Sequence, residues 1–233
     1  MLSGALLLDP NRRENSIEFY KKRLHRIGLP ILFWSIFYLI WRSVVLHEAT
    51  LRPKVLLSNI VFGSPSYHLW FLFVLFWLYL VTPILRSIWR KLDNKEKWTL
   101  TIFLLSVNSI STLLWAYAGE MGWRIPPSPV ITIEWIYYVG YFLLGFLMRG
   151  ITIDKTKAFA LAGIWLVIVI ANSIGYYALS TLEEEYRAQG LVHSYLSPLV
   201  VISSIAMFLL IKSIFSKKQN TLSRALNSSI LGS

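Results

Sequence analysis

Six long apolar segments constrain the fold of this 233-residue chain more than any other feature. They run from 28 to 46, 68 to 89, 99 to 118, 131 to 148, 158 to 178 and 195 to 215. Each contains 18 to 22 residues, and about 20 residues of α-helix cross a hydrocarbon layer of about 30 Å. They are apolar on every side, whereas the strands of a membrane β-barrel alternate over about 10 residues. The sequence therefore predicts an all-α fold, a polytopic transmembrane helix bundle.

Composition supports this fold class and excludes several kinds of chemistry. Hydrophobic residues make up 55% of the chain and charged residues 15%, whereas an ordinary soluble domain is about 25% charged. The chain has no cysteine, which excludes disulfides, thiol nucleophiles and metal–thiolate sites. Its acidic and histidine residues lack metal-ligand spacing, and no glycine-rich phosphate loop follows a strand. We therefore expect neither a bound metal nor nucleotide hydrolysis.

The basic residues predict how the chain is oriented in the membrane. Of the 23 Lys and Arg residues, 18 lie in alternate loops or at their edges, four lie in the intervening loops, and Arg42 lies inside a span. Cytoplasmic loops carry the excess of positive charge, so both chain ends are expected in the cytoplasm. This asymmetry also accounts for the net charge of +11 without a nucleic-acid partner.

The two ends of the chain resemble parts of further spans. Residues 1–8 are apolar but too short to cross a bilayer, and they lack the basic region and cleavage site of a signal peptide. They are interpreted as the inner end of a partial span that begins before Met1. We expect a membrane domain over 1–216, incomplete at its N-terminus. Residues 217–233 would then form a cytoplasmic polar tail or the start of a truncated further span.

The basic segment before the first full span is predicted to form an amphipathic helix. Asn15 stands three positions before Glu18, as in a capping arrangement at a helix start. Four apolar residues then recur at helical spacing: Ile17, Tyr20, Leu24 and Ile27. Such a helix is expected in the inner headgroup plane. Pro30 is expected to separate it from the span that follows.

Arg23 and Arg26 are candidate ligands for a phosphorylated molecule. They are three residues apart, so both guanidinium groups project from one side of the helix, and each can bind a phosphate through two hydrogen bonds. Alternatively, these residues and Lys22 only determine topology and attract anionic lipids. Composition alone favours the second interpretation.

Four segments, in order and in register with the predicted topology, resemble motifs of the acyltransferase-3 family of bacterial membrane O-acyltransferases. They are Ser-Gly-Ala-Leu-Leu at 3–7, Arg-Leu-His-Arg at 23–26 leading into Pro30, His-Leu-Trp-Phe-Leu at 68–72, and Tyr-Phe-Leu-Leu-Gly at 141–145. The resemblance implies transfer of an acyl group, usually acetyl, from acyl-CoA to a hydroxyl of an envelope polysaccharide or lipid-linked glycan. Acyl-CoA would be a co-substrate, with no bound cofactor, and the location would be the bacterial inner membrane.

The resemblance also assigns roles to particular residues. It makes Arg23 and Arg26 contacts to the phosphates of coenzyme A, with Lys22 as a supporting charge. The family's catalytic histidine lies in its first span, which here would precede Met1, and its last span would follow the chain. The catalytic base is therefore unknown from these residues.

Four polar or aromatic residues near the predicted outer ends of the spans are candidates for the acceptor side. They are His68, Trp70, Arg42 and Glu134. The alternatives are an interfacial histidine and a belt tryptophan, an arginine that reaches back to the interface, and a glutamate close enough to water to be solvated. A set of small polar residues, including Ser109, Thr112, Asn172 and Ser173, is expected to form interhelical hydrogen bonds.

Two other functions remain open from the sequence. One is a non-enzymatic transporter or exporter of envelope glycan, although paired broken helices or mid-membrane charges, which transporters use, are scarce here. The other is an inactive fragment of the acyltransferase that only assembles with partners.

Overall fold

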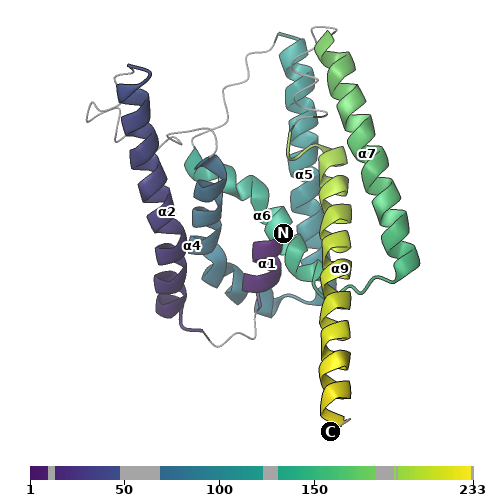
Figure 1. Ribbon diagram of the computed structural model, residues 1–233. Helices are drawn as coiled ribbons and strands as arrows, with labels where there is room; N and C mark the ends of the chain where they lie inside the picture. The colour runs from purple at the N-terminus through teal and green to yellow at the C-terminus, as the bar shows by residue number, and fades with distance from the viewer. Residues whose placement is uncertain (10–13, 48–68, 123–130, 182–191, 193, 232–233) are drawn as a thin grey trace. The chain divides into compact units, whose positions relative to one another are not determined.

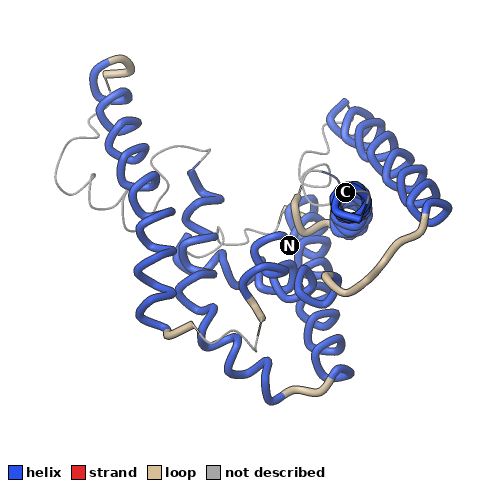
Figure 2. Tube along the Cα trace, turned by 60° about the horizontal axis from the view of Figure 1, so that its bottom comes forward, coloured by secondary structure: helices blue, strands red, loops and turns tan. Residues whose placement is uncertain are grey.

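The computed structural model describes residues 1–9, 14–47, 69–122, 131–181, 192 and 194–231. Every regular element in these ranges is an α-helix (Figures 1 and 2). The helices are α1 (Leu2–Leu7), α2 (Ser16–Val44), α4 (Trp70–Lys91), α5 (Asn94–Glu120), α6 (Ile131–Met148), α7 (Lys155–Thr181) and α9 (Pro198–Leu231). The predicted all-α fold class is confirmed.

The helices have the length and surface of membrane spans. Five of them, α2, α4, α5, α7 and α9, are long and apolar enough to cross a bilayer. The remaining predicted span, 131–148, coincides with α6. Large apolar side chains are exposed along α7, where Phe159, Val167 and Tyr177 are 85%, 66% and 72% exposed. Continuous exposed apolar surface of this kind needs lipid rather than water around it, so the chain is a multi-pass membrane protein.

The residues cluster into two compact units. One comprises residues 3–104 and 126–146, and the other comprises 1–2, 105–125 and 147–233. In the first unit α2 and α4 lie side by side, as both views show. Its core includes Phe19 and Leu39 from α2 and Val74 and Leu78 from α4, each less than 5% exposed.

Helix α2 begins where the sequence predicted, but it does not stop at Pro30. Asn15 caps it, because its Oδ1 accepts a hydrogen bond from the backbone N–H of Ile17 at 3.3 Å. The helix then continues without interruption for 29 residues, with Pro30 inside it. The predicted separation of the basic segment from the first span is therefore wrong. Phe19 and Leu39, on either side of Pro30, are both fully buried, so both parts of the helix pack in the unit, and a proline within a membrane helix removes only one backbone hydrogen bond.

Helix α4 also contains a proline, and two side-chain hydroxyls donate to backbone carbonyls near it. Pro83 has no N–H to donate within the helix. In the turn before it, the hydroxyl of Tyr20 on α2 donates to the backbone carbonyl of Leu80 at 2.7 Å. The buried hydroxyl of Thr82 donates to the carbonyl of Leu78 at 2.7 Å. Side-chain donors thus bind backbone carbonyls near the proline, as is typical of membrane helices.

The short helix α1 packs closely on α6 through a glycine. A Cβ atom built on Gly4 would lie 1.7 Å from the backbone carbonyl oxygen of Phe142. Only a residue without a side chain permits this approach. The hydroxyl of Ser3 lies 3.1 Å from that of Tyr79, so α1 also contacts α4.

The second unit is held by α7 against α9 and by polar contacts at the helix ends. The Nζ of Lys212 on α9 donates to the carbonyls of Met148 at 3.1 Å, Ile151 at 2.6 Å, and Arg149. A helix C-terminus leaves carbonyls without intrahelical partners, and this lysine binds them at the end of α6. The hydroxyl of Ser109 on α5 donates at 2.8 Å to the carbonyl of Leu196, in the turn before α9, so this serine bonds to a turn rather than to a second helix as predicted.

Other predicted features of this unit turn out differently. The hydroxyls of Thr112 and Ser173 donate to carbonyls four residues back in their own helices, not to a neighbouring helix. Their predicted interhelical bonds are therefore replaced by local ones, as is common for hydroxyl side chains within helices. Helix α9 continues to Leu231, through most of the segment for which a polar tail or the start of a further span was predicted, and both alternatives stay predictions.

Candidate functional site

The arginine pair lies on α2, and its two members have different surroundings. Arg23 is half-buried and Arg26 is exposed. The Nε atom of Arg23 is buried and has no hydrogen-bond partner in the part of the chain that the structure describes. Its guanidinium carbon lies 5.9 Å from the centre of the Phe19 ring. The pair therefore presents one partly enclosed and one accessible guanidinium group on neighbouring positions of one helix.

Arg23 borders a small pocket between α2 and α4. The lining residues are Tyr20, Arg23, Leu24 and Ile27 from α2, and Phe76, Tyr79 and Leu80 from α4. The cavity volume is about 10 Å³, which is room for about one water molecule. Most of the predicted apolar face, namely Tyr20, Leu24 and Ile27, thus lies against α4, and the position of this segment in the inner headgroup plane stays a prediction. The exception is Ile17, which is 73% exposed.

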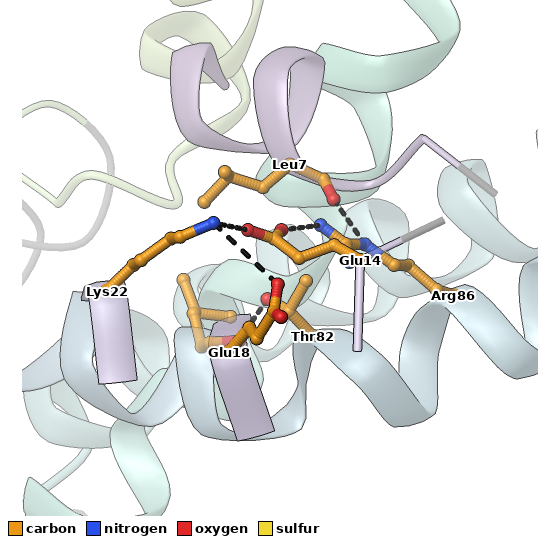
Figure 3. Close-up of polar contacts among 7 residues, drawn as sticks. Leu7, Glu14, Glu18, Lys22, Thr82 and Arg86 are labelled. Atoms are coloured by element: carbon orange, nitrogen blue, oxygen red, sulfur yellow. Dashed lines mark hydrogen bonds and ion pairs between the residues drawn. The ribbon is translucent and has the colours of Figure 1, made fainter. Parts of the chain in front are cut away.

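Lys22 is held by acidic side chains rather than left free. Its Nζ lies 3.5 Å from Glu14 Oε1 and 3.9 Å from Glu18 Oε2 (Figure 3). The lysine side chain is 62% exposed, whereas that of Glu14 is 7% exposed. Two carboxylates near one ammonium reduce the positive charge that it offers to an anionic ligand.

Sequence reasoning missed a buried arginine next to this segment. Arg86, on α4, is 6% exposed, and its Nε donates to the backbone carbonyl of Leu7 at 2.6 Å (Figure 3). One of its terminal nitrogens lies 4.0 Å from Glu14 Oε2. Its guanidinium carbon lies 4.7 Å from the centre of the Phe19 ring. Arg86 is one of the 18 basic residues assigned above to cytoplasmic loops or their edges, although its place five residues before the end of an apolar helix was a signal of burial.

The predicted acceptor-side residues are only partly covered by the structure. Trp70 is the first residue of α4, and its ring centre lies 5.6 Å from that of Tyr138. Arg42 is in the last turn of α2 and is partly exposed. His68 and the side chain of Glu134 lie outside the described residues. Arg42 and Arg23 are 19 positions apart on one helix, or about 28 Å, so the structure does not bring these two candidates together.

Comparison with known proteins gives one match. A family model described as an acyltransferase domain, Acyl_transf_3, matches residues 1–232. No curated protein and no solved structure matches the chain.

Proposed function

Because the chain belongs to the acyltransferase-3 family of membrane acyltransferases, we propose that it transfers an acyl group from acyl-CoA to a hydroxyl of a cell-envelope polysaccharide or lipid-linked glycan. Acetyl is the first candidate for the acyl group. In this reaction the hydroxyl oxygen attacks the thioester carbonyl carbon, and the carbon–sulfur bond breaks. The hydroxyl proton passes to a general base, and the sulfur leaves as the thiol of coenzyme A after taking up a proton.

The observation that carries the proposed donor site is the pair of guanidinium groups on α2, one half-buried and one exposed. Guanidinium groups bind phosphates through two parallel hydrogen bonds, and coenzyme A carries phosphates at one end of the molecule. Arg26 is accessible to such a ligand from outside. Arg23 has a buried nitrogen beside the α2–α4 pocket, so its orientation is set by packing. Lys22 would add only a weak supporting charge, because Glu14 and Glu18 lie 3.5 Å and 3.9 Å from its Nζ.

The proposal for the acceptor side is supported by the family membership and by the residues at the other ends of α2 and α4. The acceptor is proposed to bind at the ends of α2 and α4 that carry Arg42 and Trp70, with His68 and Glu134 as further candidates. An aromatic surface such as Trp70, supported by Tyr138, suits the apolar face of a sugar ring.

The proposed orientation follows from charge. The start of α2 and the end of α4 carry the basic residues Arg23, Arg26, Arg90 and Lys91. Positively charged ends face the cytoplasm, where acyl-CoA is made. We therefore propose a bacterial inner-membrane protein with both chain ends in the cytoplasm and the acceptor-side residues facing outward.

The donor site is tested with the full-length protein in proteoliposomes, acetyl-CoA and an acceptor glycan. R23Q and R26Q are each expected to raise KM for acetyl-CoA about 10-fold, the scale of a lost charge-assisted hydrogen bond. Lys21→Gln is the control, because it removes one exposed positive charge from the same helix and should leave KM within about twofold. An unchanged KM in R23Q and R26Q would refute the donor site. Glycan transport without ester formation would instead favour the transporter.

A further inference from the structure

Arg86 is a buried charged residue on the apolar helix α4. It has no direct part in the proposed chemistry. It lies in a membrane-spanning helix and is 6% exposed. Burial of a charge in such a place costs free energy unless the charge is bound by partners. Charged residues kept inside membrane helices therefore point to a function rather than to simple packing.

The partners of Arg86 come from two other segments of the same unit. Nε donates to the carbonyl of Leu7 at the end of α1, and a terminal nitrogen lies 4.0 Å from Glu14, just before α2. Figure 3 shows these groups converging between α1, α2 and α4. One guanidinium group thus joins the end of α1 and the start of α2 to α4.

The aromatic ring of Phe19 connects Arg86 to the arginine pair. Phe19 is fully buried and precedes Arg23 by one helical turn. The guanidinium carbon of Arg86 lies 4.7 Å from the ring centre, and that of Arg23 lies 5.9 Å from it. Both cations are within range of a favourable cation–π interaction. A displacement of Arg86 would therefore be transmitted through this ring to the start of α2.

We propose that Arg86 is a positioning residue for the donor site. It fixes the start of α2 against α4, so that Arg23 faces the α2–α4 pocket before acyl-CoA arrives. This inference rests on the proposed function for the identity of the ligand. The positioning itself is a property of the protein alone and is measured separately. A planar guanidinium suits this task because it can contact a carbonyl, a carboxylate and a ring face at once, which a lysine cannot.

The first experiment measures positioning without any ligand. The chain has no cysteine, so spin labels can be attached at I17C and I84C. These residues are 73% and 60% exposed and lie within about a turn of the Tyr20–Leu80 contact. Arg86→Gln is expected to broaden the label-to-label distance distribution, measured by electron paramagnetic resonance. Arg90→Gln, an exposed arginine one turn along α4, is the control and should leave it unchanged. An unchanged distribution in Arg86→Gln would overturn the proposal.

The second experiment measures the consequence for acetyl-CoA. Arg86→Lys is included because it keeps the positive charge, so this variant should fold even if Arg86→Gln does not. Arg86→Lys and Arg86→Gln are expected to raise KM about 10-fold with kcat within about twofold, since small misplacements of a binding group are costly. A residue that only stabilises the fold would lower the amount of active enzyme and leave KM unchanged. That result would also overturn the proposal.

A double variant separates this inference from the proposed function. If Arg86 acts through Arg23, the R23Q/R86Q protein should have the same KM as R23Q alone, because coupled residues are not additive. Multiplied effects would mean that Arg86 acts independently of Arg23, and the proposal would fail. If R23Q alone leaves KM unchanged, the donor site of the proposed function fails, while the spin-label result still decides whether Arg86 positions α2.

Discussion

The hydroxyl of Tyr20 on α2 donates to the backbone carbonyl of Leu80 on α4, 2.7 Å away and one turn before Pro83. This bond joins the helix that carries the arginine pair to the helix that carries Arg86. It depends on one oxygen atom, so the contribution of the bond can be measured with little change in packing.

Tyr20→Phe is expected to lower the free energy of unfolding by about 1 kcal/mol, the scale of an interhelical hydrogen bond in a membrane protein. Thermal unfolding in detergent, followed by tryptophan fluorescence, measures the change. Tyr177→Phe is the matched control, because Tyr177 is 72% exposed. Equal stability of the two variants would show that the bond contributes nothing.

Gly4→Ala is expected to disrupt the contact between α1 and α6. The new methyl group would lie 1.7 Å from the carbonyl oxygen of Phe142, so the helices must separate, at a cost of about 3 kcal/mol or more. Gly28→Ala is the control, because nothing lies within 4 Å of its added Cβ inside α2. There the higher helix propensity of alanine should stabilise by about 0.5–1 kcal/mol. Thermal stability and the yield of folded protein should both fall in Gly4→Ala and both rise in Gly28→Ala.

Lys212→Met should loosen the chain at the end of α6, because three backbone carbonyls lose the Lys212 ammonium, although that of Met148 also accepts from the N–H of Ile151 at 3.2 Å. A hydrogen bond to a charged group contributes about 1.5–3 kcal/mol, and we expect a loss of about 2 kcal/mol. Lys157→Met removes an exposed lysine whose ion pair with Asp154 spans 3.7 Å, and should change stability by less than about 0.5 kcal/mol. Hydrogen exchange of the 149–151 amides would locate the effect; unchanged protection there would contradict it.

Helix α5 begins with a reciprocal cap between Asp93 and Glu96. The backbone N–H of Glu96 donates to Asp93 Oδ1 at 2.7 Å, and the N–H of Asp93 donates to Glu96 Oε2 at 2.8 Å. Asp93→Ala should cost about 1 kcal/mol. Glu96→Gln keeps an oxygen in the same place and should be nearly neutral, since glutamine also completes this motif. Denaturation midpoints measure both variants; a large loss in Glu96→Gln would mean that charge matters more than the hydrogen bond.

The spans were predictable because a span is recognised by the length and apolarity of one continuous segment, and both are properties of the local sequence. The limits of α6 agree with the prediction for that reason. Continuity through Pro30 was not predictable from local sequence, since a proline within a membrane helix can be tolerated as well as end or kink it. The cap at Asp93 could have been recognised from its spacing to Glu96.

The surroundings of the candidate site could be predicted only in part. The spacing of Arg23 and Arg26 identified the pair, and helical periodicity identified the face of α2 beside it. The partners of Arg86 come from residues 79 and 72 positions away along the chain, Leu7 and Glu14. Such contacts between distant segments follow from the tertiary fold and have no local pattern in the sequence.

The uninterrupted helix through Pro30 links the arginine pair to bilayer thickness. A helix of 29 residues is about 43 Å long, whereas the hydrocarbon layer is about 30 Å thick. The excess must project into the headgroups or be taken up by tilt, a response to hydrophobic mismatch. Since no break separates the two parts, the helix tilts as one body, and a tilt of its apolar part displaces Arg23 and Arg26. We therefore expect the lipid chain length of a reconstituted membrane to affect the donor binding that is proposed for Arg23 and Arg26.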